Sequence, residues 1–351
     1  MPRLRNTLSK EDCLALIATE DFKRKTVSFY RYVKIENLQA LRDELYVEWD
    51  ALGVLGRTYL ASEGINAQIS VPEPHWEEFV EKLYAHPEFK DIPFKVGLEQ
   101  KESFWKLIVR LKKQIVADGL NENEYDWGNI GTHLDAENFN KEIEDGAVVV
   151  DMRNAYESRI GHFEGAICPD VDTFEEELPL VKEMLKDKKD QKILLYCTGG
   201  IRCEKASAYL KSHGFEDVNQ LQGGIIQYAH DVRQKGLPNR FKGANYVFDE
   251  RISERVSDDV LSECDQCDEK SDSFTNCANA MCNLLFIQCQ NCKSKMENCC
   301  TPECQRIIHM SDSEQRALRK RQKSSTPTLY RKRVRPKLKD IDKVEPVFEL
   351  K

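Results

Sequence analysis

Cys197 has neighbours that favour a reactive thiol. It ends the apolar run "KILLYC", and Thr198, Gly199, Gly200 and Arg202 follow before the helix-like segment "CEKASAYLKSHG". The N–H groups of a glycine-rich turn and of a helix N-terminus together favour negative charge. Such a field favours the thiolate, which is the nucleophilic form of cysteine. We therefore predict that Cys197 is a nucleophile, that Arg202 supplies a cation and that the residues between them support the loop; a buried structural cysteine is the alternative.

Two further features narrow the chemistry of this loop. Cys203 falls in the first turn of the helix, where it can either resolve a persulfide or sulfenate on Cys197 as a disulfide or simply pack. Cys197 and Arg202 form a C-x4-R pattern, which is one residue shorter than the C-x5-R loop of cysteine-dependent phosphatases. The tighter ring suits one sulfur atom better than a tetrahedral phosphate, so we do not expect a phosphatase.

A second group of cysteines indicates metal binding. It contains two C-x2-C pairs within about thirty residues, and this spacing lets both sulfurs face one tetrahedral ion at about 2.3 Å. Eight thiolates would form two four-cysteine zinc sites and leave one cysteine spare, whereas an iron–sulfur cluster is the alternative. The candidate ligands are Cys264, Cys267, Cys277, Cys282, Cys289, Cys292, Cys299, Cys300 and Cys304.

The elements that must position these residues fall into several domains, as a length of 351 residues leads us to expect. Residues 1–122 read as strand, helix, two strands, helix and strand, which predicts a ferredoxin-like, acylphosphatase-like α+β domain. Its segments are "TVSFYRYVKI", "NLQALRDELYVEWDALG" ending at Gly53, "GRTYLASEGINAQISV", "HWEEFVEKLYAH", "FKVGLE" and "FWKLIVRLKKQIVA". The segment "SEGINA", which includes Glu63 to Asn66, is predicted to be an ordinary hairpin turn, with an RNA contact as the alternative.

Residues 135–237 predict an α/β domain with a parallel sheet. "GAVVVDMR" and "KILLYC" are short continuous apolar runs, which are typical of strands covered on both faces, and helical segments lie between them. Cys197 then lies at the carboxyl end of a parallel strand, where α/β folds bind ligands. Residues 238–262 are predicted to be a connector, 263–305 a cysteine-rich metal-binding module and 306–351 a basic, disordered tail.

Charge and composition indicate the partners and the compartment. The net charge is −8, yet the segment from Arg316 to Lys339 holds eleven Lys and Arg and no acidic residue. Such a tail can bind the RNA backbone while Tyr330 stacks on a base, although solubility alone is the simpler reading. No apolar run approaches the roughly 20 residues that span a bilayer, and the first residues lack a signal-peptide pattern. Thirteen cysteines without an export signal favour a reducing compartment, so we expect the cytoplasm and no membrane partner.

The central domain resembles the rhodanese domain. Two motifs support this resemblance, "CTGGIRC" and "VVVDMRNAYESRIGHFEGAI". The second motif fits the pattern D-x-R-x3-E-x3-G-H-x2-G-A of that family. The resemblance implies that Cys197 is the loop cysteine, which holds sulfur as a persulfide in rhodaneses. Asp151 and Arg153 are expected to brace the loop, and His162 to be structural. The matching residues are Asp151, Arg153, Glu157, Gly161, His162, Gly165 and Ala166.

Longer motifs resemble the bacterial oxygen-dependent tRNA uridine-34 hydroxylases of the rhodanese superfamily. They are "SFYRYV", "GRTYLASEGINAQISVP", "SFWKLIVRLKKQIVADG", "YCTGGIRCEKASAYL", "GGIIQYA" and "NYVFDERISERVS". The resemblance implies an oxidoreductase that uses dioxygen to convert the wobble uridine to 5-hydroxyuridine, with the anticodon region of tRNA as its partner. No flavin or nucleotide motif accompanies it, and no motif indicates a reductant or an oligomeric state.

Two chemical routes and two other functions remain as alternatives. The thiolate of Cys197 can add to C6 of uracil and make C5 enolate-like, or Cys197 itself can be oxidised and pass oxygen on, with Cys203 resolving it. A rhodanese-type sulfurtransferase would share the cysteine without needing the N-terminal domain. A non-catalytic RNA-binding adaptor would have no use for the thiol.

Overall fold

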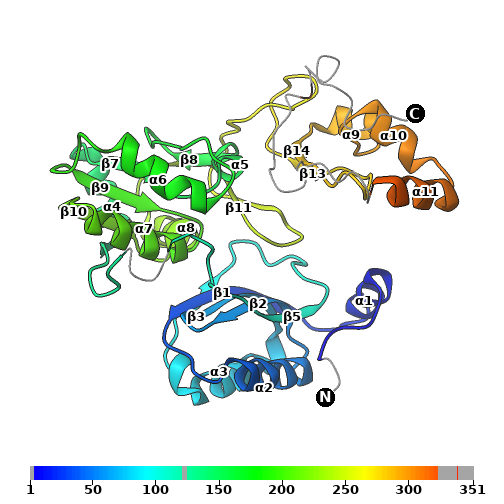
Figure 1. Ribbon diagram of the computed structural model, residues 1–351, viewed down its shortest axis with the longest axis horizontal. Helices are drawn as coiled ribbons and strands as arrows, with labels where there is room; N and C mark the ends of the chain where they lie inside the picture. The colour runs from blue at the N-terminus through cyan, green and yellow to red at the C-terminus, as the bar shows by residue number, and fades with distance from the viewer. Residues whose placement is uncertain (1–3, 121–124, 323–337, 339–351) are drawn as a thin grey trace.

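The computed structural model describes residues 4–120, 125–322 and 338. Its three parts follow one another along the chain: an N-terminal α+β domain, a central α/β domain and a C-terminal cysteine-rich module (Figure 1). This order confirms the fold class predicted from the sequence. Among the described residues, no helix combines the length and the apolar composition needed to cross a membrane.

The N-terminal domain is a five-stranded sheet covered by helices. Its strand order is β4-β1-β3-β2-β5, in which β5 runs parallel to β2 and the other neighbouring pairs are antiparallel. The first four strands have the predicted ferredoxin-like arrangement. The last two segments pair over fewer residues than predicted. The elements are α1 (Lys10–Ile17), β1 (Arg24–Tyr32), α2 (Leu38–Ala51), β2 (Leu55–Ala61), β3 (Gly64–Pro72), α3 (Trp76–Ala85), β4 (Lys95–Val96) and β5 (Leu107–Leu111).

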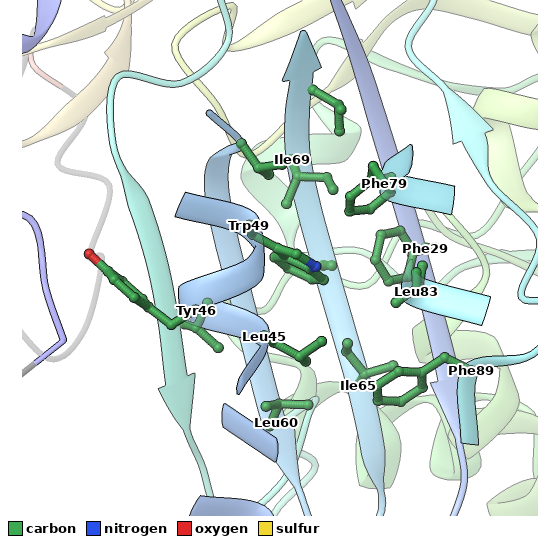
Figure 2. Close-up of a cluster of buried hydrophobic side chains, with 14 of the residues drawn as sticks. Phe29, Leu45, Tyr46, Trp49, Leu60, Ile65, Ile69, Phe79, Leu83 and Phe89 are labelled. Carbon is green, nitrogen blue, oxygen red and sulfur yellow. The ribbon is translucent and has the colours of Figure 1, made fainter. Parts of the chain in front are cut away.

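The two faces of this sheet have different partners because side chains alternate along a strand. On β1, Val27 and Phe29 point to the core, where Trp49 of α2 and Phe79 of α3 pack against them (Figure 2). Tyr30 points to the opposite face, which carries no helix and faces the central domain (Figure 1). The N-terminal sheet therefore lies between its own helices and the central domain.

The central domain contains a parallel sheet in the order β6-β10-β9-β7, as the apolar runs predicted. Its two inner strands are almost wholly buried, and helices cover them. The elements are β6 (Thr132–Leu134), α4 (Ala136–Glu144), β7 (Val148–Asp151), α5 (Ala155–Ser158), β8 (Gly161–Phe163), α6 (Phe174–Met184), β9 (Lys192–Tyr196), α7 (Ile201–Ser212), β10 (Asp217–Leu221) and α8 (Gly224–Lys235).

The remaining segments contain more structure than the sequence predicted. The segment 238–262, predicted to be a connector, includes β11 (Phe241–Tyr246), which pairs with β8, and β12 (Ser253–Arg255). The cysteine-rich module contains β13 (Phe274–Asn276), β14 (Leu285–Ile287), α9 (Gln290–Met296) and α10 (Pro302–Ile308). Helix α11 (Asp312–Gln322) replaces the predicted disorder in the first part of the tail. The residues that follow α11, which include most of the basic segment and Tyr330, lie outside the described residues, except Leu338.

Candidate functional site

Cys197 lies directly after β9, at the carboxyl end of the parallel sheet, and its side chain is fully buried. Its Sγ accepts a hydrogen bond of 3.1 Å from the N–H of Gly200. Gly200 precedes α7 with a φ of +96°, and a Cβ at this position would lie 2.8 Å from the hydroxyl of Tyr30. Glycine is therefore required here both for the backbone conformation and for the close approach.

A second helix N-terminus fixes the loop from the other side. The N–H groups of Ile225 and Ile226 in α8 donate to the carbonyls of Cys197 and Thr198 at 3.0 and 3.2 Å. A Cβ at Gly224 would lie 2.6 Å from the carbonyl oxygen of Cys197. The loop is thus held rigidly between two helices, so its N–H groups keep their orientation toward the sulfur.

The environment of the sulfur favours the thiolate. Burial alone raises the pKa of Cys197, but a hydrogen bond from the Cys203 thiol, the positive charge of Arg202 and backbone N–H groups lower it to about 5. Burial and the neighbouring thiolate raise the pKa of Cys203, which keeps its proton as the donor. The two predicted cysteines therefore lie together, one as thiolate and one as thiol.

Arg202 is held by a carboxylate instead of standing free at the mouth of the loop. Its guanidinium makes two hydrogen bonds to Glu157 of α5, at 2.7 and 2.8 Å, and both side chains are largely buried. The hydroxyl of Thr198 also lies 3.4 Å from this carboxylate. Arg202 thus contributes charge near the sulfur while its donors face Glu157. The role of Arg202 as a loop cation stays a prediction.

Asp151, at the end of β7, and Arg153 form a buried ion pair beside the end of β9. The Arg153 guanidinium donates two hydrogen bonds to Asp151, at 2.8 and 2.7 Å, and the Arg153 backbone N–H donates a third at 3.1 Å. Asp151 also accepts a hydrogen bond from the hydroxyl of Tyr196 at 2.8 Å. Because Tyr196 immediately precedes Cys197, the pair anchors the strand that presents the thiolate. His162 lies with Nδ1 2.9 Å from the carbonyl of Ser158. These contacts support the bracing roles that the sequence led us to expect.

The N-terminal domain contributes to this site, which sequence reasoning missed. The Tyr30 hydroxyl donates to Glu204 at 3.0 Å, and the Tyr32 hydroxyl donates to the carbonyl of Ile201 at 3.1 Å, so both reach the first turn of α7. Burial raises the pKa of both tyrosines, which keep their protons and remain donors. The alternation of polar residues along "TVSFYRYV" was the available signal, since it marks a second face that needs a partner.

The turn at Glu63 also belongs to this interface. Lys205 of α7 is fully buried, and its Nζ lies 3.0 Å from Glu63 and 2.7 Å from Asp118. The Lys205 ammonium also donates to the carbonyl of Val116 at 3.0 Å. The turn is thus an interdomain contact at Glu63, in addition to being the predicted hairpin turn.

Two hollows meet at Tyr30 and Lys95, and the smaller one reaches the Cys197 loop. A cavity of about 290 Å³ lies between the helix-free face of the N-terminal sheet and the loop. A larger interdomain groove of about 990 Å³ adjoins it and contains Tyr32 and Trp127, whose ring centroids are 4.5 Å apart. Tyr30 and Lys95 line both hollows. A groove lined by aromatic, basic and acidic side chains therefore leads to the cavity beside Cys197.

The cysteine-rich module brings eight of its nine cysteines into two groups of four. One group is Cys264, Cys267, Cys289 and Cys292, and the other is Cys277, Cys282, Cys300 and Cys304; within each group all sulfurs lie within 4.8 Å of one another. Three Sγ–Sγ distances are 3.6, 3.6 and 3.7 Å. A tetrahedron with zinc–sulfur bonds of about 2.3 Å has edges of about 3.8 Å, so both groups fit a tetrahedral ion.

Family models match three consecutive parts of the chain. The models are described as "UPF0176 acylphosphatase like domain" over residues 24–115, "Rhodanese-like domain" over 135–231 and "Rhodanase C-terminal" over 242–305. A solution NMR structure of a rhodanese-like domain from Anabaena sp. is 22% identical, covers 32% of this chain and 80% of that chain, and has a TM-score of 0.26.

Curated relatives match nearly the whole chain. The tRNA uridine(34) hydroxylase of Leptospira interrogans is 52% identical over 340 residues, which is 96% of this chain and 93% of the relative. The tRNA uridine(34) hydroxylase of Yersinia enterocolitica is 48% identical over 322 residues, 91% of this chain and 92% of the relative. The similarity thus extends across both domains and most of the cysteine-rich module.

Proposed function

The chain belongs to the tRNA uridine(34) hydroxylase family, and from this membership we propose that it hydroxylates uridine 34 of tRNA at C5, with dioxygen as the oxygen source. Cys197 is the reactive centre, and the anticodon region of tRNA is the partner. The observation that carries this proposal is a buried thiolate that faces a cavity built by two domains.

The two hollows suit a single base and its neighbours. A nucleobase that reacts must leave its stack and enter a closed pocket, and the cavity of about 290 Å³ beside Cys197 has this position. The groove of about 990 Å³ can hold the adjacent nucleotides, because Tyr32 and Trp127 offer stacking surfaces and basic side chains offer phosphate contacts. The N-terminal domain accounts for one wall of each hollow, which a plain sulfurtransferase does not need.

The chemistry balances if a two-electron donor takes part. One oxygen atom of dioxygen enters at C5, and the other leaves as water after receiving two electrons and two protons. Addition of the Cys197 thiolate to C6 makes C5 electron-rich, so that C5 can accept oxygen. Cys203 lies within hydrogen-bonding distance of Cys197 and can form the disulfide required by the alternative route through an oxidised cysteine. Mass spectrometry for an RNA adduct at Cys197 distinguishes the two routes, since the first alone forms one.

The decisive experiment compares wobble nucleosides in aerobic cells that lack the protein and any parallel route to the same nucleoside. We expect 5-hydroxyuridine to return with the wild type and with Cys13→Ser, a buried cysteine outside the site, but not with Cys197→Ser. Restoration by Cys197→Ser would refute the proposal. If 5-hydroxyuridine persists without the protein while 2-thiouridine falls, the protein is a sulfurtransferase instead. In vitro, ¹⁸O from labelled dioxygen should appear in the product.

We also propose that the two cysteine groups hold zinc. All-cysteine sites without a free coordination position are typical of structural zinc, so the ions would stabilise the C-terminal module and take no part in the oxygen chemistry. Elemental analysis of anaerobically purified protein should find about two zinc ions per chain, as four ligands per ion require. A brown protein that contains iron and acid-labile sulfide would refute this assignment.

A further inference from the structure

Lys95 is a largely buried lysine whose ammonium lacks a charged partner. Its side chain is only 7% exposed, and its Nζ lies 4.3 Å from the ring centroid of Tyr30. In the part of the chain that the structure describes, no carboxylate and no hydrogen-bond acceptor lies within bonding distance of this Nζ. By contrast, the buried cations Arg153, Arg202 and Lys205 each have a carboxylate partner. Lys95 is therefore the buried cation at the site whose donors are free for a ligand.

The position of Lys95 places these donors where a reacting base must arrive. Lys95 begins the edge strand β4, which pairs with β1 and is held against α8 by a 2.7 Å contact between His230 and the carbonyl of Val96. Its Cδ lies 3.8 Å from the point that a Cβ on Gly199 would occupy, in the loop of Cys197. Lys95 lines both the cavity and the groove. A base that enters from the groove therefore passes the ammonium before it meets the thiolate.

Burying this charge without a partner is unfavourable. Burial removes the ammonium from most of its water, and the contact with the Tyr30 ring offsets only part of this desolvation penalty. Burial accordingly lowers the pKa of Lys95 to about 8, while the charges of Cys197 and Glu204 act in the opposite direction. The nearby negative charges thus offset only part of the desolvation of the Lys95 ammonium. An acceptor that carries or gains negative charge is the ligand that would satisfy the free donors.

We propose that Lys95 donates a hydrogen bond to a carbonyl oxygen of the pyrimidine that reacts at Cys197, and stabilises the negative charge that this oxygen gains. The inference rests on the proposed function and deepens it by naming the group that receives the charge. In the addition step, a sulfur lone pair forms the S–C6 bond, the C5–C6 π pair moves between C4 and C5, and the C4 carbonyl π pair moves to O4. No group leaves, and this step needs no oxidant or reductant.

The charge on O4 appears only as the sulfur–carbon bond forms. A donor aimed at O4 therefore binds the transition state more strongly than the ground state and raises kcat rather than lowering KM. This distinguishes Lys95 from a residue that merely holds tRNA by its phosphates, whose loss would raise KM. It also distinguishes Lys95 from a residue that activates the sulfur, whose loss would make Cys197 less reactive toward other reagents.

The test uses the full-length protein with Lys95→Met, Lys95→Arg and a matched control, Lys25→Met. Lys25 lies 4.2 Å from the ring centroid of Trp76 and lines neither hollow, so the control removes a similar cation–aromatic contact away from the site. Three quantities are measured: kcat and KM for formation of 5-hydroxyuridine in a U34-containing tRNA, and the alkylation rate of Cys197 by iodoacetamide, resolved by peptide mass spectrometry. We expect Lys95→Met to lower kcat on the order of 100-fold, with little change in KM or in alkylation.

Lys95→Arg should recover part of kcat because it keeps the charge, and Lys25→Met should behave as wild type. A kcat for Lys95→Met within about threefold of wild type, well short of the expected loss, would overturn the proposal. A fall in alkylation equal to the fall in kcat would also overturn it, since Lys95 would then act through the sulfur. If the wild type forms no 5-hydroxyuridine, the proposed function fails and this inference fails with it. If Lys95→Met and the wild type are both fully active, the proposed role of Lys95 is refuted while the proposed function stands.

Discussion

The buried ion pairs of Lys205 should control how firmly the two domains hold together. Lys205 is fully buried on α7 and faces Asp118, also fully buried, and Glu63 of the hairpin turn. The change Lys205→Met leaves two carboxylates at the interface without their cation. Removing one member of a buried pair costs about 3–5 kcal/mol, because the remaining charge keeps its desolvation penalty. With 1.36 kcal/mol for each tenfold change, the interface should open between about 100-fold and a few thousand-fold more often.

Hydrogen–deuterium exchange measures this opening directly. Amides in α7 and in the turn at Glu63 should exchange faster in Lys205→Met by that factor, while amides of β7, on the far side of the parallel sheet, should change little. The matched control is the triple variant Lys205→Met, Asp118→Asn, Glu63→Gln. It removes all three charges together, so most of the lost stability should return. The reasoning is refuted if the single variant speeds exchange by less than tenfold, or if the triple variant is worse than the single one.

Three further predictions concern the sulfur, the lysine and the metals. Alkylation of Cys197 should rise with pH through a midpoint near 5, because the thiolate forms above its pKa; a midpoint near 9 would contradict the site electrostatics. Turnover should fall as pH rises past about 8, because Lys95 then loses its proton. Lys95→Arg should move this fall in turnover to higher pH. If the fall stays at the same pH in Lys95→Arg, another group causes it. Cys299→Ala should keep both metal ions in elemental analysis, whereas Cys300→Ala should lose one, since only Cys300 belongs to a group of four.

The place of Cys197 in the candidate site was predictable because its signals are local. The apolar strand, the glycines and the start of α7 are contiguous, and each has a physical reason to favour a thiolate at Cys197. Strand β1 of the N-terminal domain was equally accessible, since alternation along "TVSFYRYV" predicts both a strand and two distinct faces. The length of the short edge strand β4 was less predictable, because Pro93 two residues before it cannot donate to a ladder, which the apolar pattern does not express.

The contribution of Lys95 to the site was not predictable from the sequence. Lys95 lies about a hundred residues before Cys197, and nothing in "DIPFKVGLE" distinguishes it from a solvent-exposed lysine. The cysteine groups show the same limit. The two C-x2-C pairs belong to the same group, although Cys277 and Cys282 of the other group lie between them in the sequence, so pairs from the two groups alternate along the chain. Only the fold determines that alternation, and only the fold identifies Cys299 as the cysteine outside both groups.

Helix α7 connects the two halves of the candidate site. Its first turn supplies N–H groups that stabilise the thiolate. In the same turn, the carbonyl of Ile201 accepts a hydrogen bond from the Tyr32 hydroxyl, and Glu204 accepts one from the Tyr30 hydroxyl. Opening of the interface therefore withdraws the cavity wall and the Lys95 ammonium together, while the loop hydrogen bond from Gly200 to the sulfur lies within the central domain. A partly opened protein would keep a reactive thiolate but lose the groups that select a base. We therefore expect the buried ion pairs at Lys205 to protect the selectivity of the thiolate as well as the stability of the fold.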